Sequence, residues 1–264
     1  MTSAGEVEQF AYCAHNWLLA RHGVEGNLPG TQRGIEEHRA AGAALASSQR
    51  EERDFRAGLA WSLRISLVGL SILLVVLAVA LLENSLVSLL ALAVALLVLL
   101  ASSALLTVAL ASQVRARRIQ RAAHLVPGQV LQDDLGAQAP LLEDPTWGIS
   151  GRPDYLLQTR SGTVPVEVKT GRTPDAPYRS HALQLACYLR LVEATSGRAP
   201  EYGFLSYPGG TFRVEWDDAL REDLRQTVER LAVARASGVA DRDHDQPGRC
   251  RGCARRAACD QRLA

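Results

Sequence analysis

Three charged residues near the middle of the chain have the types and the spacing of a metal-dependent site. Asp154 follows a Gly-Arg-Pro run, and Glu167 and Lys169 stand two residues apart a short way downstream. Two carboxylates supply the hard oxygen ligands that a divalent cation such as Mg²⁺ prefers. Lys169 is the only lysine of the chain, and lysine differs from arginine in being a compact charge with a movable pKa. We therefore expect these three side chains to carry chemistry.

The element predicted to position them is a β-hairpin. Ile149–Gln158 and Val164–Lys169 have the composition of strands, and Ser161-Gly162 between them favours a turn. Side chains two apart on a strand point to the same face, so Glu167 and Lys169 share one.

The register of this hairpin decides where Asp154 lies. Pro165 has no N–H to donate to a partner strand. A four-residue loop from Arg160 to Thr163 turns the nitrogen of Pro165 outward and places Asp154 opposite Lys169. Cross-strand partners share a face, so this register brings the Asp, the Glu and the Lys together.

Asp, a gap and Glu-x-Lys on a hairpin resembles the PD-(D/E)XK nuclease superfamily. Two more segments resemble motifs of its RecB-like branch: Gly34-Ile35-Glu36-Glu37-His38 is similar to the G-x-x-x-H helix motif, and Gln184-Leu185-Ala186-Cys187-Tyr188 to the Q-x-x-x-Y motif. A resemblance to the iron–sulfur arrangement of the CRISPR-associated RecB-like exonucleases rests on Cys13, Cys250, Cys253 and Cys259. The similarity extends over Phe10 to about Arg39 and from about Val130 to the end.

The resemblance implies a restriction-endonuclease-like α/β fold, with a mixed β-sheet flanked by helices, that hydrolyses DNA phosphodiesters. Exonuclease action on single-stranded ends is the activity it favours. The expected ligands of one Mg²⁺ or Mn²⁺ ion are Asp154, Glu167, His38 and the carbonyl of Val168. Lys169 is expected to orient or deprotonate the attacking water, and Gln184 and Tyr188 are expected to contact the DNA strand.

The cysteines predict a second metal centre. Cys250, Cys253 and Cys259 provide three soft ligands in an arginine-rich tail that cannot form a core by itself, and Cys13 can supply a fourth. Four thiolates suit zinc or an iron–sulfur cluster. The spacing alone favours zinc, whereas the resemblance favours a 4Fe-4S cluster. Cys187 is left over and is expected to be a buried thiol in a helix.

Composition limits the other possibilities. The net charge is +1, so no strong overall field attracts nucleic acid. Met1–Gln9 contains acidic residues and lacks the apolar core of a secretory signal. Much of the hydrophobic content, which is 47% overall, lies between Leu59 and Ala111.

That apolar region predicts a membrane hairpin. Leu59–Leu82 is nearly all apolar and Ser85–Ala111 carries no charge, and Glu83-Asn84 connects them. A bilayer core of roughly 30 Å needs about 20 residues of helix, which each segment exceeds. The alternative is a pair of buried helices in a soluble core, but two adjacent runs of this length argue against it.

Arginines set the expected orientation. They flank both ends of the hairpin and are absent from its turn, so the positive-inside rule puts both termini in the cytoplasm and the two spans in the cell membrane. These flanks can bind lipid phosphates or DNA, and lipid is the simpler interpretation. The flanking arginines are Arg50, Arg53, Arg56, Arg64, Arg115, Arg117, Arg118 and Arg121.

Four segments are expected on these grounds. They are an N-terminal helical part of the nuclease domain (1–56), the transmembrane hairpin with its basic flanks (57–125), the nuclease core (126–240) and a cysteine-rich tail (241–264). Other predicted elements are helices at Val7–Arg21, from Thr31 or Gln32 onward, at Ser180–Ala194 and from Asp217 or Asp218 to about Ala236, and strands at Gln129–Gln132, Tyr202–Tyr207 and Thr211–Trp216.

Two other functions remain open from the residues alone. One is a catalytically silent, membrane-anchored module that binds nucleic acid or acts as a sensor, with an iron–sulfur or zinc centre. The other is a membrane scaffold with a zinc-stabilised soluble domain, which leaves the Asp and Glu-x-Lys geometry as a coincidence.

Overall fold

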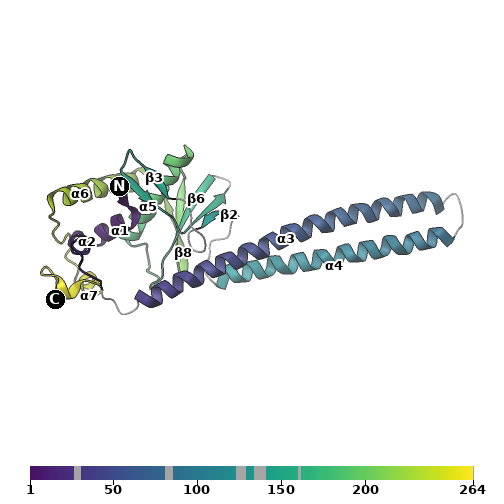
Figure 1. Ribbon diagram of the computed structural model, residues 1–264, viewed down its shortest axis with the longest axis horizontal. Coiled ribbons are helices and arrows are strands. Elements are labelled where there is room, and N and C mark those ends of the chain that lie inside the picture. The colour runs from purple at the N-terminus through teal and green to yellow at the C-terminus, as the bar shows by residue number, and fades with distance from the viewer. Residues whose placement is uncertain (27–30, 81–85, 123–128, 134–140, 160–161, 264) are drawn as a thin grey trace. The chain divides into compact units, whose positions relative to one another are not determined.

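The chain forms two compact units, shown in Figure 1. The computed structural model describes residues 1–26, 31–80, 86–122, 129–133, 141–159 and 162–263. One unit combines Met1–Ala43 with Ala123–Ala264, and the other is Ala44–Ala122. The first unit is a mixed α/β structure with two sheets flanked by helices, and the second is a helical hairpin.

The larger sheet has five strands in the order β2-β5-β6-β7-β8. The central β6 pairs antiparallel with β5 and parallel with β7, and the remaining pairs are antiparallel, so the sheet is mixed as predicted. Val164 and Val166 of β6 are fully buried, as expected of a central strand. The strands are β2 (Gln129–Asp133), β5 (Tyr155–Thr159), β6 (Gly162–Val168), β7 (Tyr202–Tyr207) and β8 (Gly210–Glu215).

The smaller sheet has three strands in the order β1-β4-β3 and shows that one predicted strand is in fact two. It consists of β1 (Thr2–Ser3), β4 (Ile149–Gly151) and β3 (Leu142–Asp144). The predicted strand Ile149–Gln158 is wrong, because β4 and β5 belong to different sheets and are separated by Arg152, Pro153 and Asp154. Pro153 has no N–H for a ladder, so the chain leaves one sheet here and enters the other.

The hairpin of β5 and β6 has a different register from the predicted one. Thr159 pairs with Gly162 and Tyr155 with Val166, so two residues, rather than four, connect the strands, and both lie outside the described ranges. Extending this register sets Asp154 in line with Glu167 instead of Lys169. Because the error is two residues, each side chain keeps its predicted face.

Pro165 fits this register without the longer loop. It lies opposite Leu156 of β5, and the parallel pairing with β7 begins one residue later at Val166.

Helix α5 (Arg179–Ser196) is the central helix of this unit and packs on β6 and β7 and against α1 (Ala4–Tyr12). Most of its residues between Leu183 and Val192 are buried, so this part of the helix lies in the core. Helix α6 (Asp218–Ser237) packs against α5 and α1, and Asp217 caps it by accepting a hydrogen bond from the Leu220 N–H, as predicted.

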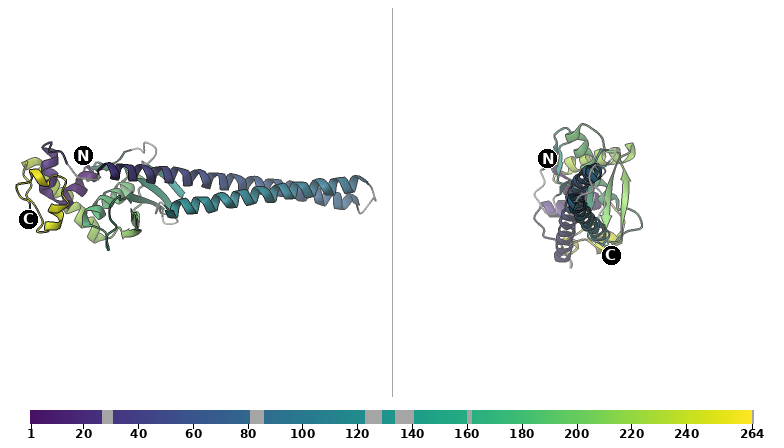
Figure 2. Two further views of the ribbon diagram at one scale, coloured as in Figure 1. Left: turned by 90° about the horizontal axis from the view of Figure 1, so that it is seen from below. Right: turned by 90° about the vertical axis from the view of Figure 1, so that its right-hand side faces the viewer.

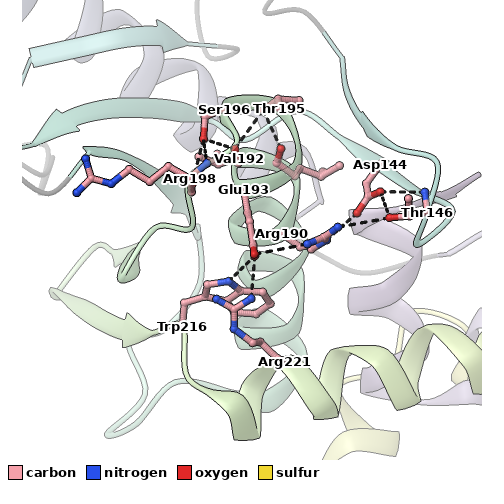
Figure 3. A network of polar contacts seen from close by, with 11 residues as sticks. Asp144, Thr146, Arg190, Val192, Glu193, Thr195, Ser196, Arg198, Trp216 and Arg221 are labelled. Atoms are coloured by element: carbon pink, nitrogen blue, oxygen red, sulfur yellow. Dashed lines mark hydrogen bonds and ion pairs between the residues drawn. The ribbon is translucent and has the colours of Figure 1, made fainter.

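Polar contacts anchor the second half of α5 to its neighbours, as Figure 3 shows. Arg190 Nε donates to the buried carboxylate of Asp144 on β3 over 2.7 Å. Glu193 Oε2 accepts from Trp216 Nε1 over 3.1 Å and from Arg221 Nη1 of α6 over 2.8 Å. These contacts fix the position of α5 relative to β3 and α6, and therefore also the positions of the side chains on α5.

Near the N-terminus, the predicted helix Val7–Arg21 is interrupted. Ser3 and Glu6 form a capping box that starts α1, and Cys13 separates α1 from α2 (Ala14–Arg21). Cys13 has extended backbone angles, φ −168° and ψ 119°, which no helical position tolerates. The C-terminal residues form the short helices α7 (Pro247–Arg251) and η1 (Arg256–Ala258).

The helical hairpin consists of α3 (Thr31–Ala80) and α4 (Leu86–Ala122), which run side by side in Figures 1 and 2. Two segments, Arg39–Val79 and Leu92–Ala122, are long and apolar enough to cross a membrane by length and composition. Many of their leucines are exposed, with Leu67 and Leu97 each at 65%. The connection predicted at Glu83-Asn84 lies outside the described residues.

Small residues form the seam between the two hairpin helices. Ser62 and Ser102 each donate from the hydroxyl to the other's carbonyl, over 3.0 and 2.9 Å. Gly58 and Ala109 approach so closely that a Cβ on Gly58 lies 2.9 Å from the Cβ of Ala109. Small and hydroxyl-bearing residues at close contacts are typical of helices that associate within a membrane.

Candidate active site

Asp154, Glu167 and Lys169 converge where β6 ends. Asp154 is 9% exposed and Glu167 is 5% exposed. Asp154 Oδ2 accepts a hydrogen bond from the Val168 N–H over 2.6 Å, which holds the carboxylate against the end of β6. Lys169 Nζ lies 3.3 Å from Glu167 Oε1. The structure therefore brings together the three side chains that the sequence singled out.

A fourth charged residue, Glu8, joins this group, although nothing in the sequence marks it. Its Oε1 lies 3.1 Å from Lys169 Nζ and 3.3 Å from His181 Nε2. Glu8 belongs to α1, and His181 to the first turn of α5. The packing of α1 on α5 delivers both, and such a long-range contact leaves no local motif.

Lys169 is held by three acceptors. Its ammonium group donates a hydrogen bond to the amide oxygen of Gln184 and forms ion pairs with Glu8 Oε1 and Glu167 Oε1. A lysine amine has three protons to donate only when it is charged. Burial lowers the pKa of Lys169, but the carboxylates of Glu167 and Glu8 raise it more, so its pKa lies above the ordinary value.

Glu167 has the environment of a cation ligand. Its Oε2 is buried and has no hydrogen-bond partner among the described residues. Burial first, and the neighbouring charge of Asp154 second, raise the pKa of Glu167 well above its usual range. A buried carboxylate oxygen with no donor, beside a second carboxylate, fits a divalent metal ion, which satisfies the orphaned oxygen and offsets the repulsion.

Gln184 and Tyr188 of α5 form a chain of hydrogen bonds that begins at Lys169. They are four residues apart on α5, both are buried, and Gln184 Nε2 donates to the Tyr188 hydroxyl oxygen over 3.2 Å. Burial raises the pKa of Tyr188 far above its usual value, so it stays a phenol. The ring packs against Gly151, where a Cβ would lie 2.8 Å from Tyr188 Cε1. The glycine of the Gly-Arg-Pro-Asp run thus makes room for this ring.

His181 is a neutral imidazole. Burial first, and the charge of Lys169 second, lower its pKa to about 3. The Tyr207 hydroxyl and His181 Nδ1 are 2.7 Å apart, and burial raises the pKa of Tyr207 to about 12, so the phenol donates. The proton of the neutral imidazole is then on Nε2, which lies 3.3 Å from Glu8 Oε1.

One predicted metal ligand cannot be placed. His38 belongs to α3, but its side chain lies outside the part of the chain whose side chains are described. Val168, whose carbonyl was the other predicted ligand besides the carboxylates, is the last residue of β6.

The four cysteines of the predicted second centre line one small pocket. The walls also contain Tyr12, Asn16 and several arginines, and the cysteines are unpaired thiols. Burial raises the pKa of Cys13 and of Cys259, and the neighbouring cysteines add to this. Four sulfur donors surrounded by cationic side chains fit a thiophilic metal centre. The arginines of this pocket are Arg242, Arg249, Arg256 and Arg262.

A histidine and an aspartate lie close to one of these cysteines. His15, Cys259 and Asp260 place one ligand atom each within 4.8 Å of the others, so nitrogen and oxygen donors also lie at the edge of this centre. Cys187 is fully buried in α5, as predicted.

The fold and the site fit one class of enzyme, the metal-dependent hydrolases in which two carboxylates at the end of a strand of a mixed sheet bind a divalent ion beside a lysine. The sequence profile of the PD-(D/E)XK nuclease superfamily matches residues 77–260, which contain β2 to β8, Asp154, Glu167 and Lys169. The chain belongs to the PD-(D/E)XK nuclease superfamily. Superfamily membership indicates a metal-dependent nuclease that hydrolyses phosphodiesters, generally with Mg²⁺ or Mn²⁺. A search of curated proteins gave no significant match.

Proposed function

We propose that this protein is a deoxyribonuclease of the RecB-like branch, anchored in the cell membrane by two helices and acting as an exonuclease on single-stranded DNA ends. Its membership of the superfamily supports the general chemistry. The observation that carries the proposal is the convergence of Asp154, Glu167 and Lys169, with one oxygen of Glu167 buried and unpartnered among the described residues.

In the proposed site the chain supplies the ligands and the charge. The metal, when bound, polarises the phosphate and provides an activated water. Asp154 and Glu167 bind it through their carboxylates, with His38 and the Val168 carbonyl as further ligands by resemblance. Lys169 orients the water and balances charge that develops on the phosphate.

Gln184 and Tyr188 support this lysine in the proposal. The Gln184 amide oxygen accepts a hydrogen bond from Lys169, and its Nε2 donates one to the Tyr188 hydroxyl, so the pair restricts the position of the ammonium group. The resemblance adds contact with the DNA strand to their role.

Cleavage by the purified full chain in detergent tests the proposal. We expect degradation of a labelled single-stranded oligonucleotide that requires Mg²⁺ or Mn²⁺ and stops with a chelator. Glu167→Gln removes the charged ligand while keeping the volume of the side chain, and should abolish cleavage. Glu215→Gln is the control, because Glu215 is exposed on β8 and pairs only with Arg213 among the described residues. Binding of DNA without cleavage at any metal concentration would instead favour the catalytically silent module.

We propose that Cys13, Cys250, Cys253 and Cys259 hold a 4Fe-4S cluster. Their lining of one pocket supports a shared centre, and the resemblance favours iron over zinc. Anaerobically purified protein should be brown, Cys253→Ala should lose the colour, and Cys187→Ala should keep it. If protein never exposed to oxygen contains stoichiometric zinc and no iron, the four cysteines form a zinc site and the cluster assignment is wrong.

We also propose the topology and the division of the chain that the sequence predicts, with the hairpin of 57–125 as the anchor and the nuclease segments on the cytoplasmic side. Its support is the pair of long apolar helices and the arginines at both ends of the hairpin. Protease protection in membrane vesicles checks it. Residue 10 and residue 250 should be cleaved from the same side, and protection of only one of them contradicts two spans.

A further inference from the structure

A pocket with a volume of about 460 Å³ lies at the N-terminal end of α5. Pockets of roughly 300 Å³ and more accommodate small organic ligands. Its walls come from three parts of the chain: the end of α1, the start of α5 and the segment around α7. The residues that give it its chemistry are Tyr12, Tyr178, Arg179, His181, Gln246 and Arg249.

The walls are aromatic and cationic. None of the described residues that line the pocket is acidic. Arg249 Nη1 donates to the neutral carbonyl of Tyr12 over 3.0 Å, and the same residue also lines the cysteine pocket. Arg179 is different, because its Nε donates to the carboxylate of Asp223 over 2.9 Å. Arg249 is therefore the cation best able to meet an anion.

Tyr178 offers an accessible ring at the mouth of the pocket. It is 52% exposed. Its ring stands perpendicular to that of His181, with centroids 5.3 Å apart, so this contact covers at most one of its two faces. An exposed aromatic face beside an arginine has the composition of single-strand nucleic acid sites, where bases stack on aromatic rings and cations bind the backbone.

His181 joins this pocket to the candidate active site. It lines the pocket and its Nε2 lies 3.3 Å from Glu8 Oε1, which in turn lies 3.1 Å from Lys169 Nζ. A strand whose phosphate lies at Asp154 and Glu167 therefore has a neighbouring nucleotide within reach of the pocket.

We propose that the pocket binds one unstacked nucleotide adjacent to the phosphate that is cleaved, with the base on the Tyr178 ring and the backbone phosphate at Arg249. In a duplex the bases are stacked and paired and their faces are unavailable. The pocket therefore selects single-stranded nucleic acid. This inference rests on the proposed function, because it takes the carboxylate and lysine cluster as the place where the phosphate reacts.

Binding, rather than cleavage, tests the inference. The full chain in detergent is titrated into a labelled 12-nucleotide oligothymidylate and into a duplex of equal length, with Ca²⁺ replacing Mg²⁺, and fluorescence anisotropy is recorded. Tyr178→Ala should weaken binding of the single strand about tenfold, within the range for loss of one base stack, and leave the duplex unchanged. Tyr178→Phe keeps the ring and should bind like the parent. Tyr202→Ala is the control, because Tyr202 stands on β7 and does not line the pocket.

The outcomes separate this inference from the nuclease proposal. If the protein does not cleave DNA but Tyr178→Ala weakens its binding of the single strand, the nucleotide pocket is supported and the nuclease proposal is contradicted. A protein that cleaves DNA while Tyr178→Ala binds the single strand as the parent does overturns the pocket alone. The pocket is also overturned if the parent protein does not bind the single strand, or if Tyr178→Ala weakens binding of the single strand and of the duplex equally. A third contrary result is that Tyr178→Ala keeps its affinity for the single strand but binds anionic lipid vesicles less tightly than the parent does.

Discussion

At the scale of single residues, Glu8 tests whether the lysine must be held in place. Glu8→Gln keeps the shape of the side chain but removes one of the two carboxylates beside Lys169. We expect kcat to fall about tenfold, since general positioning effects are of this order or larger, with little change in the Mn²⁺ concentration for half-maximal activity. Steady-state cleavage at varied Mn²⁺ measures both quantities. An unchanged kcat would make Glu8 a surface charge, and a large shift in metal affinity would make it a ligand.

The sequence predicted the reactive group but not its supporting residues. Glu167 and Lys169 are visible because side chains two apart along a strand share a face, and Asp154 is visible because the predicted register, although wrong by two residues, keeps it on that face. Glu8 and His181 are invisible, since an acid on a short amphipathic helix and a histidine at a helix start are ordinary. Only the packing of α1 against α5 turns them into partners of the lysine.

Asp144 gives a pH-dependent prediction. Burial raises the pKa of this carboxyl, but hydrogen bonds from Thr146 and Arg190 lower it more, so it lies below the ordinary 3.8. A depressed carboxyl pKa stabilises the fold above the unfolded pKa, and this stability is lost as the pH falls through the folded pKa. Asp144→Asn should therefore destabilise the protein by roughly 2 kcal/mol at pH 7 and by less near pH 3, which lies below the unfolded pKa. Thermal unfolding at the two pH values measures this difference, and an equal loss at both contradicts it.

At the scale of elements, Gly151 at the end of β4 packs against Tyr188 of α5. A Cβ there meets Tyr188 at 2.8 Å and the Cβ of Ala4 at 3.1 Å. Gly151→Ala should lower the free energy of unfolding by about 1–3 kcal/mol, as overpacking does, and reduce activity through displacement of Tyr188. Gly171→Ala is the matched control, because nothing lies within 4 Å of a Cβ at that position. Chemical denaturation compares them, and equal stabilities would show that the contact relaxes freely.

The predicted element boundaries are wrong at two places where a single residue changes the direction of the chain. The run Val7–Arg21 has helical spacing throughout, yet Cys13 is extended and divides it. Nothing in the local sequence distinguishes this cysteine from a helical one. Ile149–Gln158 failed similarly at Pro153, where the breaking residue was visible but the existence of a second sheet was not.

At the scale of the whole molecule, the seam of the hairpin tests the pairing of α3 and α4. Ser102 is buried and bonds Ser62, whereas its neighbour Ser103 is exposed and bonds only Leu100 among the described residues. Ser102→Leu should separate the helices, at a cost of roughly 1–3 kcal/mol for overpacking, and Ser103→Leu should be neutral in detergent. Proteolysis in micelles reports the difference. Equal resistance in both variants would contradict this pairing.

The sequence predicted a hairpin of two apolar helices and a mixed α/β unit, and the structure has both. The membrane pattern was strong because it depends on composition over long runs. The sequence did not predict that α3 runs as one helix of 50 residues. Its polar first part and its apolar second part have different residue patterns, and nothing in either pattern shows that the helix continues from one into the other.

The central claim is that Asp154, Glu167 and Lys169 form the site at which DNA is hydrolysed, and Lys169→Arg tests it most directly. The variant keeps the positive charge but replaces a compact ammonium by a planar fork that cannot satisfy the same three acceptors. The measurement is the initial rate of cleavage of single-stranded DNA at saturating Mn²⁺, with equal melting temperatures establishing that both proteins are folded. We predict a loss of about 10²-fold or more, as for groups that act on the transition state. A variant that cleaves as fast as the parent would contradict this account.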